Sequence, residues 1–217
     1  MPTIGFILAC LVFTGALIWA EYRGNARLRW RAKPAASLAF IFVAVASGAP
    51  DSVFGQWVLA ALLLCAAGDI LLIPDGEKTF LAGMGAFALG HAAYIAGFLS
   101  GGASPGFLFF AAAIAMAVFV VLALGWLWPH LGRFRWPVTA YSTIIAVMTA
   151  TSVLASPPDN RAVAMVVAGA VGFAVSDLAV ARDQFVARNF FNKLWGLPLY
   201  YGAQLLLATS VYGPGAV

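Results

Sequence analysis

Two aspartates stand inside long apolar stretches of the sequence, and they are the residues best suited to do chemistry. Asp69 lies in WVLAALLLCAAGDILLI and Asp177 lies in AVAMVVAGAVGFAVSDLAVA. Neither stretch contains a lysine or an arginine. A carboxylate is costly to place in hydrocarbon, so an ionisable residue inside a membrane segment is a hypothesis about function. Each acid lies about four residues before the end of its stretch, so we expect both to reach one buried polar site.

Further polar and aromatic side chains recur near the same depth, and they are the candidates for binding a substrate. In 79–99, Phe80, Phe87, His91 and Tyr94 fall on one helical face. The candidate substrate-binding residues are Phe80, His91, Tyr94, Tyr141, Ser176, Tyr200 and Gln204. Structural explanations compete with this one: the acids can be neutral groups that hold helices together, the histidine can be a core residue, and the tyrosines can be interfacial aromatics.

The composition identifies the solvent around the chain. Of the 217 residues, 63% are hydrophobic and 9% are charged, whereas soluble domains carry about 25% charged residues. A span needs about 20 apolar residues, so the chain is predicted to be all-α, a single polytopic domain over 1–217 with eight transmembrane helices. The predicted spans are 3–20, 34–49, 56–73, 79–99, 106–128, 137–155, 161–181 and 195–213.

The basic residues predict how the spans are oriented. Eleven of the twelve lysines and arginines fall between alternate pairs of spans, in the loops 21–33, 74–78, 129–136 and 182–194. The other set of loops holds only Arg161. The positive-inside rule makes the basic set cytoplasmic and both termini non-cytoplasmic, in an integral protein of a bacterial plasma membrane. The formal charge of +4 then faces anionic membrane lipids, and no nucleic-acid partner is expected.

Several kinds of membrane chemistry lack the residues that they need. The chain has two histidines and two cysteines, too few for a three-histidine zinc site, and it contains no HExxH or GxSxG motif. Cys10 and Cys65 both fall inside spans and are interpreted as small hydrophobes. We therefore expect no metal and no cofactor. The sequence indicates no particular oligomeric state.

The order of the polar motifs resembles a known family. The segment GDILLIPDGEKTFLAGMGAFALGHAAYIAGF, with SDLAVAR and LPLYYGAQLLLATS after it, is similar to the YhhN family, whose animal members are lysoplasmalogenases. The resemblance extends over essentially the whole chain. It implies an eight-span enzyme that hydrolyses the vinyl ether bond of a lysoplasmalogen, giving a fatty aldehyde and a glycerophospho-alcohol. The paired acids of the family map onto Asp69 and Asp177.

The reaction that the resemblance implies suits two carboxyl groups. Protonation of the β-carbon of a vinyl ether gives an oxocarbenium ion, to which water adds. Burial and a neighbouring carboxylate both favour the protonated form of one acid, while the other acid stays ionised, as glycosidases divide labour between two carboxyls. The hydrocarbon chain of the lysophospholipid should lie between apolar helices. Its phosphate should face the basic loops, where the candidate cations are Lys78, Arg133, Arg135, Arg182, Arg188 and Lys193.

Two other functions fit the same acids. A proton-coupled transporter or permease would use Asp69 and Asp177 as a relay. A structural lipid-binding protein would tolerate the loss of both. The outer halves of the spans are nearly all Ala, Leu, Val and Phe, which favours a site open to one side and hence an enzyme.

Overall fold

The chain folds as an all-α bundle in the computed structural model, which describes residues 2–157 and 160–211. These residues contain no β-strand, so the predicted fold class is confirmed. The helices are α1 (Pro2–Arg23), α2 (Ala26–Ala46), α3 (Val53–Leu71), α4 (Glu77–Leu99), α5 (Phe107–Leu131), α6 (Arg135–Thr151), α7 (Asn160–Ala181) and α8 (Phe190–Thr209).

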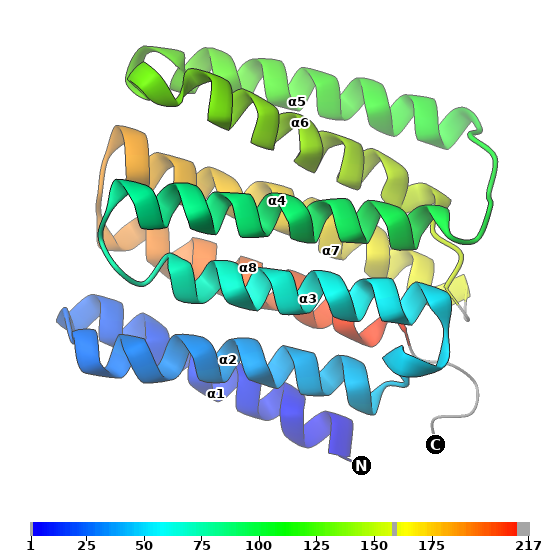
Figure 1. Cartoon of the computed structure of the whole chain (residues 1–217), viewed down its shortest axis with the longest axis horizontal. Helices are drawn as coiled ribbons and strands as arrows, with labels where there is room; N and C mark the ends of the chain where they lie inside the picture. Colours follow the sequence, from blue (N-terminus) through cyan, green and yellow to red (C-terminus); the bar gives the residue numbers. More distant parts are fainter. Residues whose placement is uncertain (1, 158–159, 212–217) are drawn as a thin grey trace.

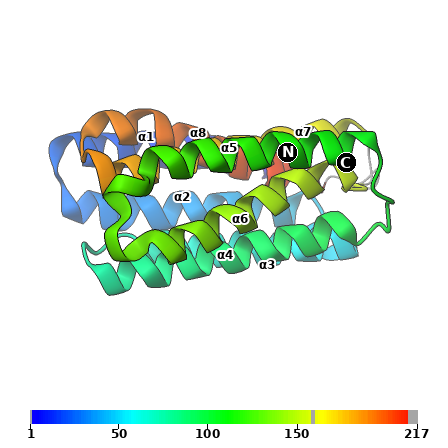
Figure 2. The same cartoon turned by 90° about the horizontal axis from the view of Figure 1, so that it is seen from above.

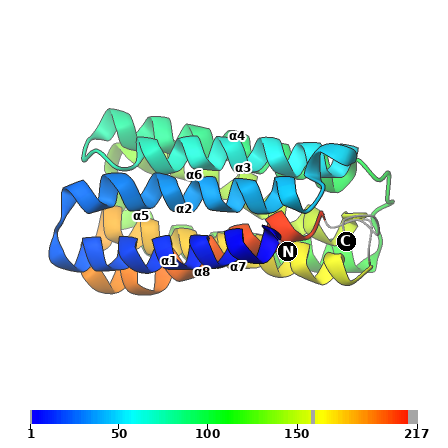
Figure 3. The same ribbon diagram turned by 90° about the horizontal axis from the view of Figure 1, so that it is seen from below.

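The helices form two layers whose axes run roughly along one direction (Figure 1). One layer contains α2, α3, α4 and α6, and the other contains α1, α8, α7 and α5, as the views from above and below show (Figures 2 and 3). Consecutive helices pack as hairpins, and α8 also contacts α1, α2 and α3. Residues far apart in the sequence, on α2, α3 and α8, therefore meet inside the bundle.

Short polar residues mark where several helices begin. Asn25 precedes α2 in an extended conformation, and its side chain accepts a hydrogen bond from the backbone N–H of Leu28 at 3.1 Å. Ser52 and Asn189 cap α3 and α8 in the same way. Each cap satisfies a backbone donor that a helix start leaves without an intrahelical partner.

The α1–α2, α3–α4, α5–α6 and α7–α8 connections gather at one end of the bundle, on the left in Figure 1. Helix α1 begins and α8 ends at the opposite end. The eleven basic residues of the alternate loops therefore share one end, which we call the basic end. The basic end also carries the acidic residues Glu21, Asp75, Glu77 and Asp183.

The prediction for the second span was wrong at its start. Pro34 was interpreted as a boundary and 21–33 as a loop, but α2 begins at Ala26 and carries Pro34 in its interior. Only Gly24 and Asn25 separate α1 from α2. A proline removes one helical hydrogen bond, yet a helix packed among other helices tolerates that loss. Lys33 consequently lies on a helix and not in a loop.

The other seven predicted spans agree with α-helices to within five residues at each end. Residues 212 and 213 of the last span lie outside the described residues. Among those that are described, five helical stretches are long and apolar enough to cross a membrane, one of which joins α5 and α6. Helices α2 and α8 are not among the five.

Small residues let the hairpin helices approach closely. A Cβ atom on Gly90 of α4 would lie 2.8 Å from Sγ of Cys65 on α3, too close for a side chain. A Cβ atom on Gly172 of α7 would lie 3.3 Å from Cβ of Ala203 on α8. Such contacts are typical of packing between membrane helices, and the second involves the ridge of small residues on α7 that leads to Ser176.

Candidate active site

Asp69 lies two residues before the end of α3 and is held by side chains from two other helices. Its Oδ2 accepts hydrogen bonds from Oγ of Ser37 on α2 at 2.7 Å and from the hydroxyl of Tyr200 on α8 at 2.8 Å. The ammonium of Lys33, also on α2, lies 3.3 Å from Oδ1. The side chain of Asp69 is 3% exposed. A buried carboxylate requires such donors, because desolvation otherwise removes its charge.

The pairing of Asp69 with Lys33 corrects the expectation that no basic residue accompanies either acid. The apolar stretch around Asp69 contains no lysine, but α2 runs beside α3 and brings one from another part of the chain. Lys33 and Ser37 are one helical turn apart on α2, so both face Asp69. The spacing Lys-x-x-x-Ser was the only signal of this contact in the sequence.

A buried chain of hydrogen bonds extends from Asp69 to two of the predicted residues. The hydroxyl of Tyr200 accepts a hydrogen bond from Nε2 of Gln204 at 3.2 Å, and Oε1 of Gln204 accepts one from the hydroxyl of Tyr94 at 2.7 Å. Tyr94 and Gln204 are completely buried. These two residues therefore orient Tyr200, which in turn orients Asp69.

Asp177 belongs to a second polar cluster, four residues before the end of α7. The hydroxyl of Tyr141 on α6 donates to its Oδ2 at 2.9 Å, and Nε2 of His91 on α4 lies 3.3 Å from the same hydroxyl. No hydrogen bond from a described residue reaches the other oxygen, Oδ1. The side chain of Asp177 is 17% exposed. Asp177 is thus held by one neutral donor on one oxygen, in contrast to Asp69.

Three aromatic rings fill the space between the two clusters. The ring of Phe173 packs against those of His91 and Tyr200, with centroids 4.5 and 5.3 Å apart. Phe87 packs edge-on against both Phe173 and Tyr200. The two acids are therefore connected by a rigid aromatic wall. Nδ1 of His91 is buried and has no hydrogen-bond partner among the described residues.

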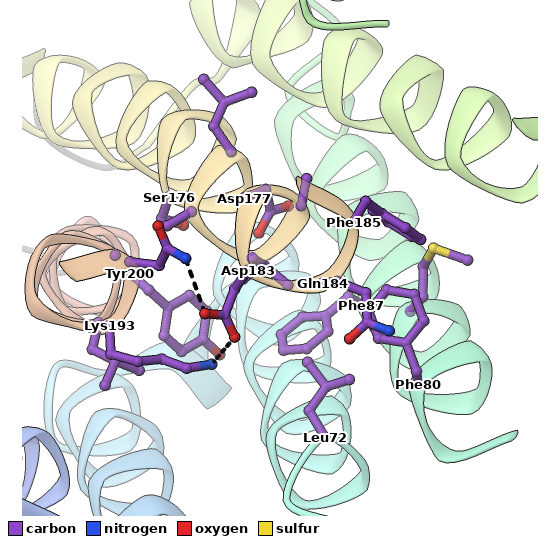
Figure 4. Close-up of a pocket in the computed structure, with 18 of the residues that line it drawn as sticks. Leu72, Phe80, Phe87, Ser176, Asp177, Asp183, Gln184, Phe185, Lys193 and Tyr200 are labelled. Carbon is purple, nitrogen blue, oxygen red and sulfur yellow. Dashed lines mark hydrogen bonds and ion pairs between the residues drawn. The ribbon is translucent and has the colours of Figure 1, made fainter. Parts of the chain in front are cut away.

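Both acids line one cavity of about 210 Å³ near the basic end of the bundle (Figure 4). Tyr141, Tyr200 and Ser176 line it too, although Oγ of Ser176 donates to the carbonyl of its own helix, at Phe173. Phe80 lines the cavity near its mouth and packs against the rings of Phe134 and Phe185. His91, Tyr94 and Gln204 do not line the cavity. The structure thus assembles the predicted residues as a wall and a layer behind it.

The mouth of the cavity is built on a turn of π-helix that follows α7, at Arg182–Val186. Such turns occur often at functional sites. They also displace side chains from the regular helical positions. Asp183 on this turn accepts hydrogen bonds from Nζ of Lys193 at 2.9 Å and from Nδ2 of Asn192 at 3.0 Å. The close-up shows Asp183 and Lys193 side by side at the cavity (Figure 4). Neither Asp183 nor Asn192 was predicted from the sequence.

Two more ion pairs stand at the mouth. Arg188 pairs with Asp75 of the α3–α4 connection, and the guanidinium holds the pKa of the Asp75 carboxyl below its ordinary value. Arg29 lies 3.9 Å from Glu21. All four side chains line the cavity. The mouth therefore carries paired charges of both signs.

The cavity selects among the six cations predicted to face a phosphate. Only Arg188 and Lys193 line it, together with Arg29 and Lys33, which were not on that list. The cations that do not line the cavity are Lys78, Arg133, Arg135 and Arg182. Among the described residues, no group of three or more histidine, cysteine, aspartate or glutamate side chains is arranged to hold a metal ion.

Comparison with known proteins adds a family to this geometry. The model of the YhhN family matches residues 28–211. A lysoplasmalogenase of Mycobacterium tuberculosis is 35% identical over 198 residues, covering 88% of this chain and 72% of the relative. Lysoplasmalogenase TMEM86B of Mus musculus is 30% identical, covering 94% of this chain and 84% of the relative. The uncharacterized membrane protein YhhN of Escherichia coli O157:H7 is 25% identical over 95% of this chain and 98% of its own length.

No solved structure matches the chain. The match to the family model includes both acids, Lys33 and every predicted site residue. The chain belongs to the YhhN family.

Proposed function

We propose that this protein is a membrane-embedded hydrolase that cleaves the vinyl ether bond of lysoplasmalogen-type lysophospholipids. The products are a fatty aldehyde and a glycerophospho-alcohol. Relatives named lysoplasmalogenase support the reaction. The observation that carries the proposal is that two carboxyl groups from different helices line one cavity, which has a charged mouth and an apolar interior.

The surroundings of the two acids support different roles for them. Asp69 accepts two hydrogen bonds and an ion pair, and charge-assisted contacts of this kind favour the carboxylate. Asp177 accepts one hydrogen bond from Tyr141 on Oδ2. A protonated Asp177 keeps that bond and is able to present a proton on Oδ1. We therefore assign Asp177 as the general acid and Asp69 as the ionised partner.

The reaction then proceeds with atoms and charges balanced. Asp177 transfers its proton to the β-carbon of the vinyl ether, and the carboxylate of Asp69 stabilises the oxocarbenium ion. Water adds to the α-carbon and returns its proton to the carboxylate of Asp177. The hemiacetal collapses to the aldehyde as its hydroxyl proton passes to the departing glycerol oxygen. General acid catalysis of this kind typically contributes about 10²–10⁴-fold, and a second carboxylate adds electrostatic stabilisation.

His91 and the Tyr94–Gln204 pair hold the acids in place in this mechanism. They contact Tyr141 and Tyr200 and do not line the cavity. Phe80 and Ser176 contact the substrate through the cavity wall. No step requires a metal or a cofactor.

A transporter has less support than an enzyme. Polar residues in the half of the bundle away from the basic end bond to carbonyls of their own helices, as Ser152 does to Thr149 and Ser210 does to Leu207. None of these residues lines the cavity. A relay needs polar groups that face a path through both halves.

The proposed setting is a single domain of eight spans in the plasma membrane, with the basic end in the cytoplasm and both termini outside. The collection of eleven basic residues at one end supports it. Lys78→Cys at the basic end should resist an impermeant thiol reagent in intact cells, whereas Ala103→Cys in the α4–α5 loop should react. The native cysteines are buried and give a low background. The reverse pattern would invert the orientation.

One assay tests the proposed function directly. Purified protein is incubated with a lysoplasmalogen and with its saturated alkyl-ether analogue, and released aldehyde is measured. We expect aldehyde from the vinyl ether alone, because only its β-carbon accepts a proton to give an oxocarbenium ion. If the vinyl ether stays intact with folded protein, the proposal is wrong.

A further inference from the structure

The cavity changes in chemistry along its length. At its mouth are the charged residues Arg29, Asp75, Asp183, Arg188 and Lys193. The two acids that react stand below them. Beyond the acids, four lining residues from α5 and α6 are apolar, and we call this part the chain furrow: Phe119, Val120, Ala123 and Ile145.

This order matches the order of groups along a single-chain ether phospholipid: charged head group, glycerol, vinyl ether and hydrocarbon. We propose that the chain furrow binds the hydrocarbon chain and sets the length of chain that the protein accepts. The proposal rests on the proposed function, since it assigns the part of the same substrate beyond the reacting bond. It commits the furrow to one occupant, an unbranched alkyl or alkenyl chain.

Depth along the helices supports this arrangement. Asp177 lies four residues from the last residue of α7, or about 6 Å along the helix. Ile145 lies ten residues from the first residue of α6, about 15 Å. Phe119 lies twelve residues from the last residue of α5, about 18 Å. The furrow thus extends roughly 9–12 Å deeper than the acid that reacts.

The two faces of α5 separate the furrow from the surrounding lipid. Val121 and Leu122 are 68% and 67% exposed and point away from the bundle. Ala123 and Phe119, on the other face, are partly buried and line the cavity. The substrate chain therefore contacts protein on the inner face of α5, while bilayer lipid contacts the outer face. Discrimination between chain lengths becomes possible because the walls are fixed side chains.

Ala123 is the residue that should control this discrimination. It has the smallest side chain in the furrow, and it lies one helical turn from Phe119 toward the basic end. A phenylalanine at this position would occupy the space that the chain needs below the acids. A long chain would then be unable to extend to Ile145, whereas a short chain would end before the obstruction.

The experiment compares Ala123→Phe with Val121→Phe, which adds the same ring to the lipid-facing side of the same helix. For each variant, kcat/KM is measured with lysoplasmalogens of long and short alkenyl chain. We expect Ala123→Phe to lower kcat/KM at least tenfold for the long chain and less than threefold for the short one. Val121→Phe should leave both values unchanged. Equal losses for both chains, or no loss, would overturn the proposal.

A second measurement does not depend on turnover or on a folded variant. Wild-type protein is irradiated with a saturated alkyl-ether lysophospholipid that carries a photoreactive group at the end of its chain. We expect the label on residues 119–127 of α5 and 142–145 of α6, and its loss when unlabelled alkyl-ether lysophospholipid competes. Labelling of α1 or α3 would overturn the proposal. If the furrow is labelled but no vinyl ether is cleaved, the proposed function fails and the binding site stands.

Discussion

The ammonium of Lys33 lies 3.3 Å from Oδ1 of Asp69, although neither residue's own segment contains an opposite charge at that depth. The pair joins α2 to α3, and Ser37 and Tyr200 complete the contacts of the carboxylate. Removal of one partner from a buried ion pair leaves the other charge uncompensated. Lys33 therefore has a measurable role both in folding and in keeping Asp69 ionised.

Lys33→Met should lower turnover at least tenfold and destabilise the protein. A fully buried pair loses roughly 3–5 kcal/mol when one partner is removed, and the loss here should be smaller because Lys33 also lines the cavity. Turnover and thermal unfolding in detergent measure the two effects. Lys33→Arg should retain much of both, since a guanidinium also pairs with a carboxylate.

Two controls separate charge pairing from general damage to α2. Arg31→Met makes a comparable change at an exposed position two residues away and should have little effect. The double variant Lys33→Met with Asp69→Asn should regain stability without regaining turnover, because it removes both charges. Wild-type turnover in Lys33→Met would show that the ammonium has no part in the reaction.

Asp177→Asn should reduce turnover by about 10²–10⁴-fold, the usual contribution of a general acid, while the protein stays folded. Tyr141→Phe removes the hydroxyl that donates to Oδ2 of Asp177, and it should reduce turnover about tenfold by leaving that oxygen without its donor, at a cost of roughly 1–3 kcal/mol. Tyr22→Phe, at an exposed tyrosine, is the matched control. Near-normal turnover in Asp177→Asn would make that residue structural.

The sequence was sufficient to predict the helices, because apolar runs of membrane length persist whatever their neighbours are. The exception was α2, where Pro34 resembled a boundary and hid Lys33 in a presumed loop. Depth was also predictable in part: Asp177 lies four residues from its helix end, as expected, and Asp69 lies two.

The sequence did not predict which helices are neighbours. The contacts of Asp69 come from α2 and α8, and those of Asp177 from α4 and α6. Local periodicity gives the face of one helix, but the partner of that face depends on packing between segments far apart in the chain. For the same reason the π-helical turn and its Asp183 were missed, since a turn of this kind has no simple sequence pattern.

Cations at the mouth should contribute to substrate binding more than to the reaction itself. Arg29→Gln, Arg188→Gln and Lys193→Gln should each raise KM several-fold with little change in kcat, because a phosphate contact lies far from the reacting bond. Arg133→Gln and Arg135→Gln should not, since neither residue lines the cavity. Steady-state kinetics on lysoplasmalogen distinguish the two groups. A uniform KM across all five variants would mean that the head group is recognised elsewhere.

The Asp75–Arg188 pair should give stability a defined dependence on pH. Arg188 holds the pKa of the Asp75 carboxyl below its ordinary value of 3.8. The stabilisation is therefore fully present above that value and is lost as pH falls through the lower pKa of the folded state. The pair is largely exposed, so screening limits it to at most about 0.5 kcal/mol.

Asp75→Asn measures this contribution. The difference in unfolding free energy between wild type and variant should stay constant from about pH 8 to pH 5 and disappear below about pH 3. It should also shrink at high ionic strength. A difference that grows as the pH falls would contradict the assigned direction of the pKa change.

Gly68, directly before Asp69, should be intolerant of any side chain. A Cβ atom there would lie 2.7 Å from two ring carbons of Phe87, whose ring packs edge-on against Tyr200, the hydrogen-bond donor to Asp69. Gly68→Ala should therefore displace Phe87 and then Tyr200, costing about 1–3 kcal/mol by overpacking and lowering turnover. Gly85→Ala on α4 is the control, because a Cβ atom there meets nothing within 4 Å, and alanine should gain about 0.5–1 kcal/mol from helix propensity. Thermal unfolding and turnover of both variants check this prediction. If Gly68→Ala is as stable and active as Gly85→Ala, the contact between Phe87 and Tyr200 does not position Asp69.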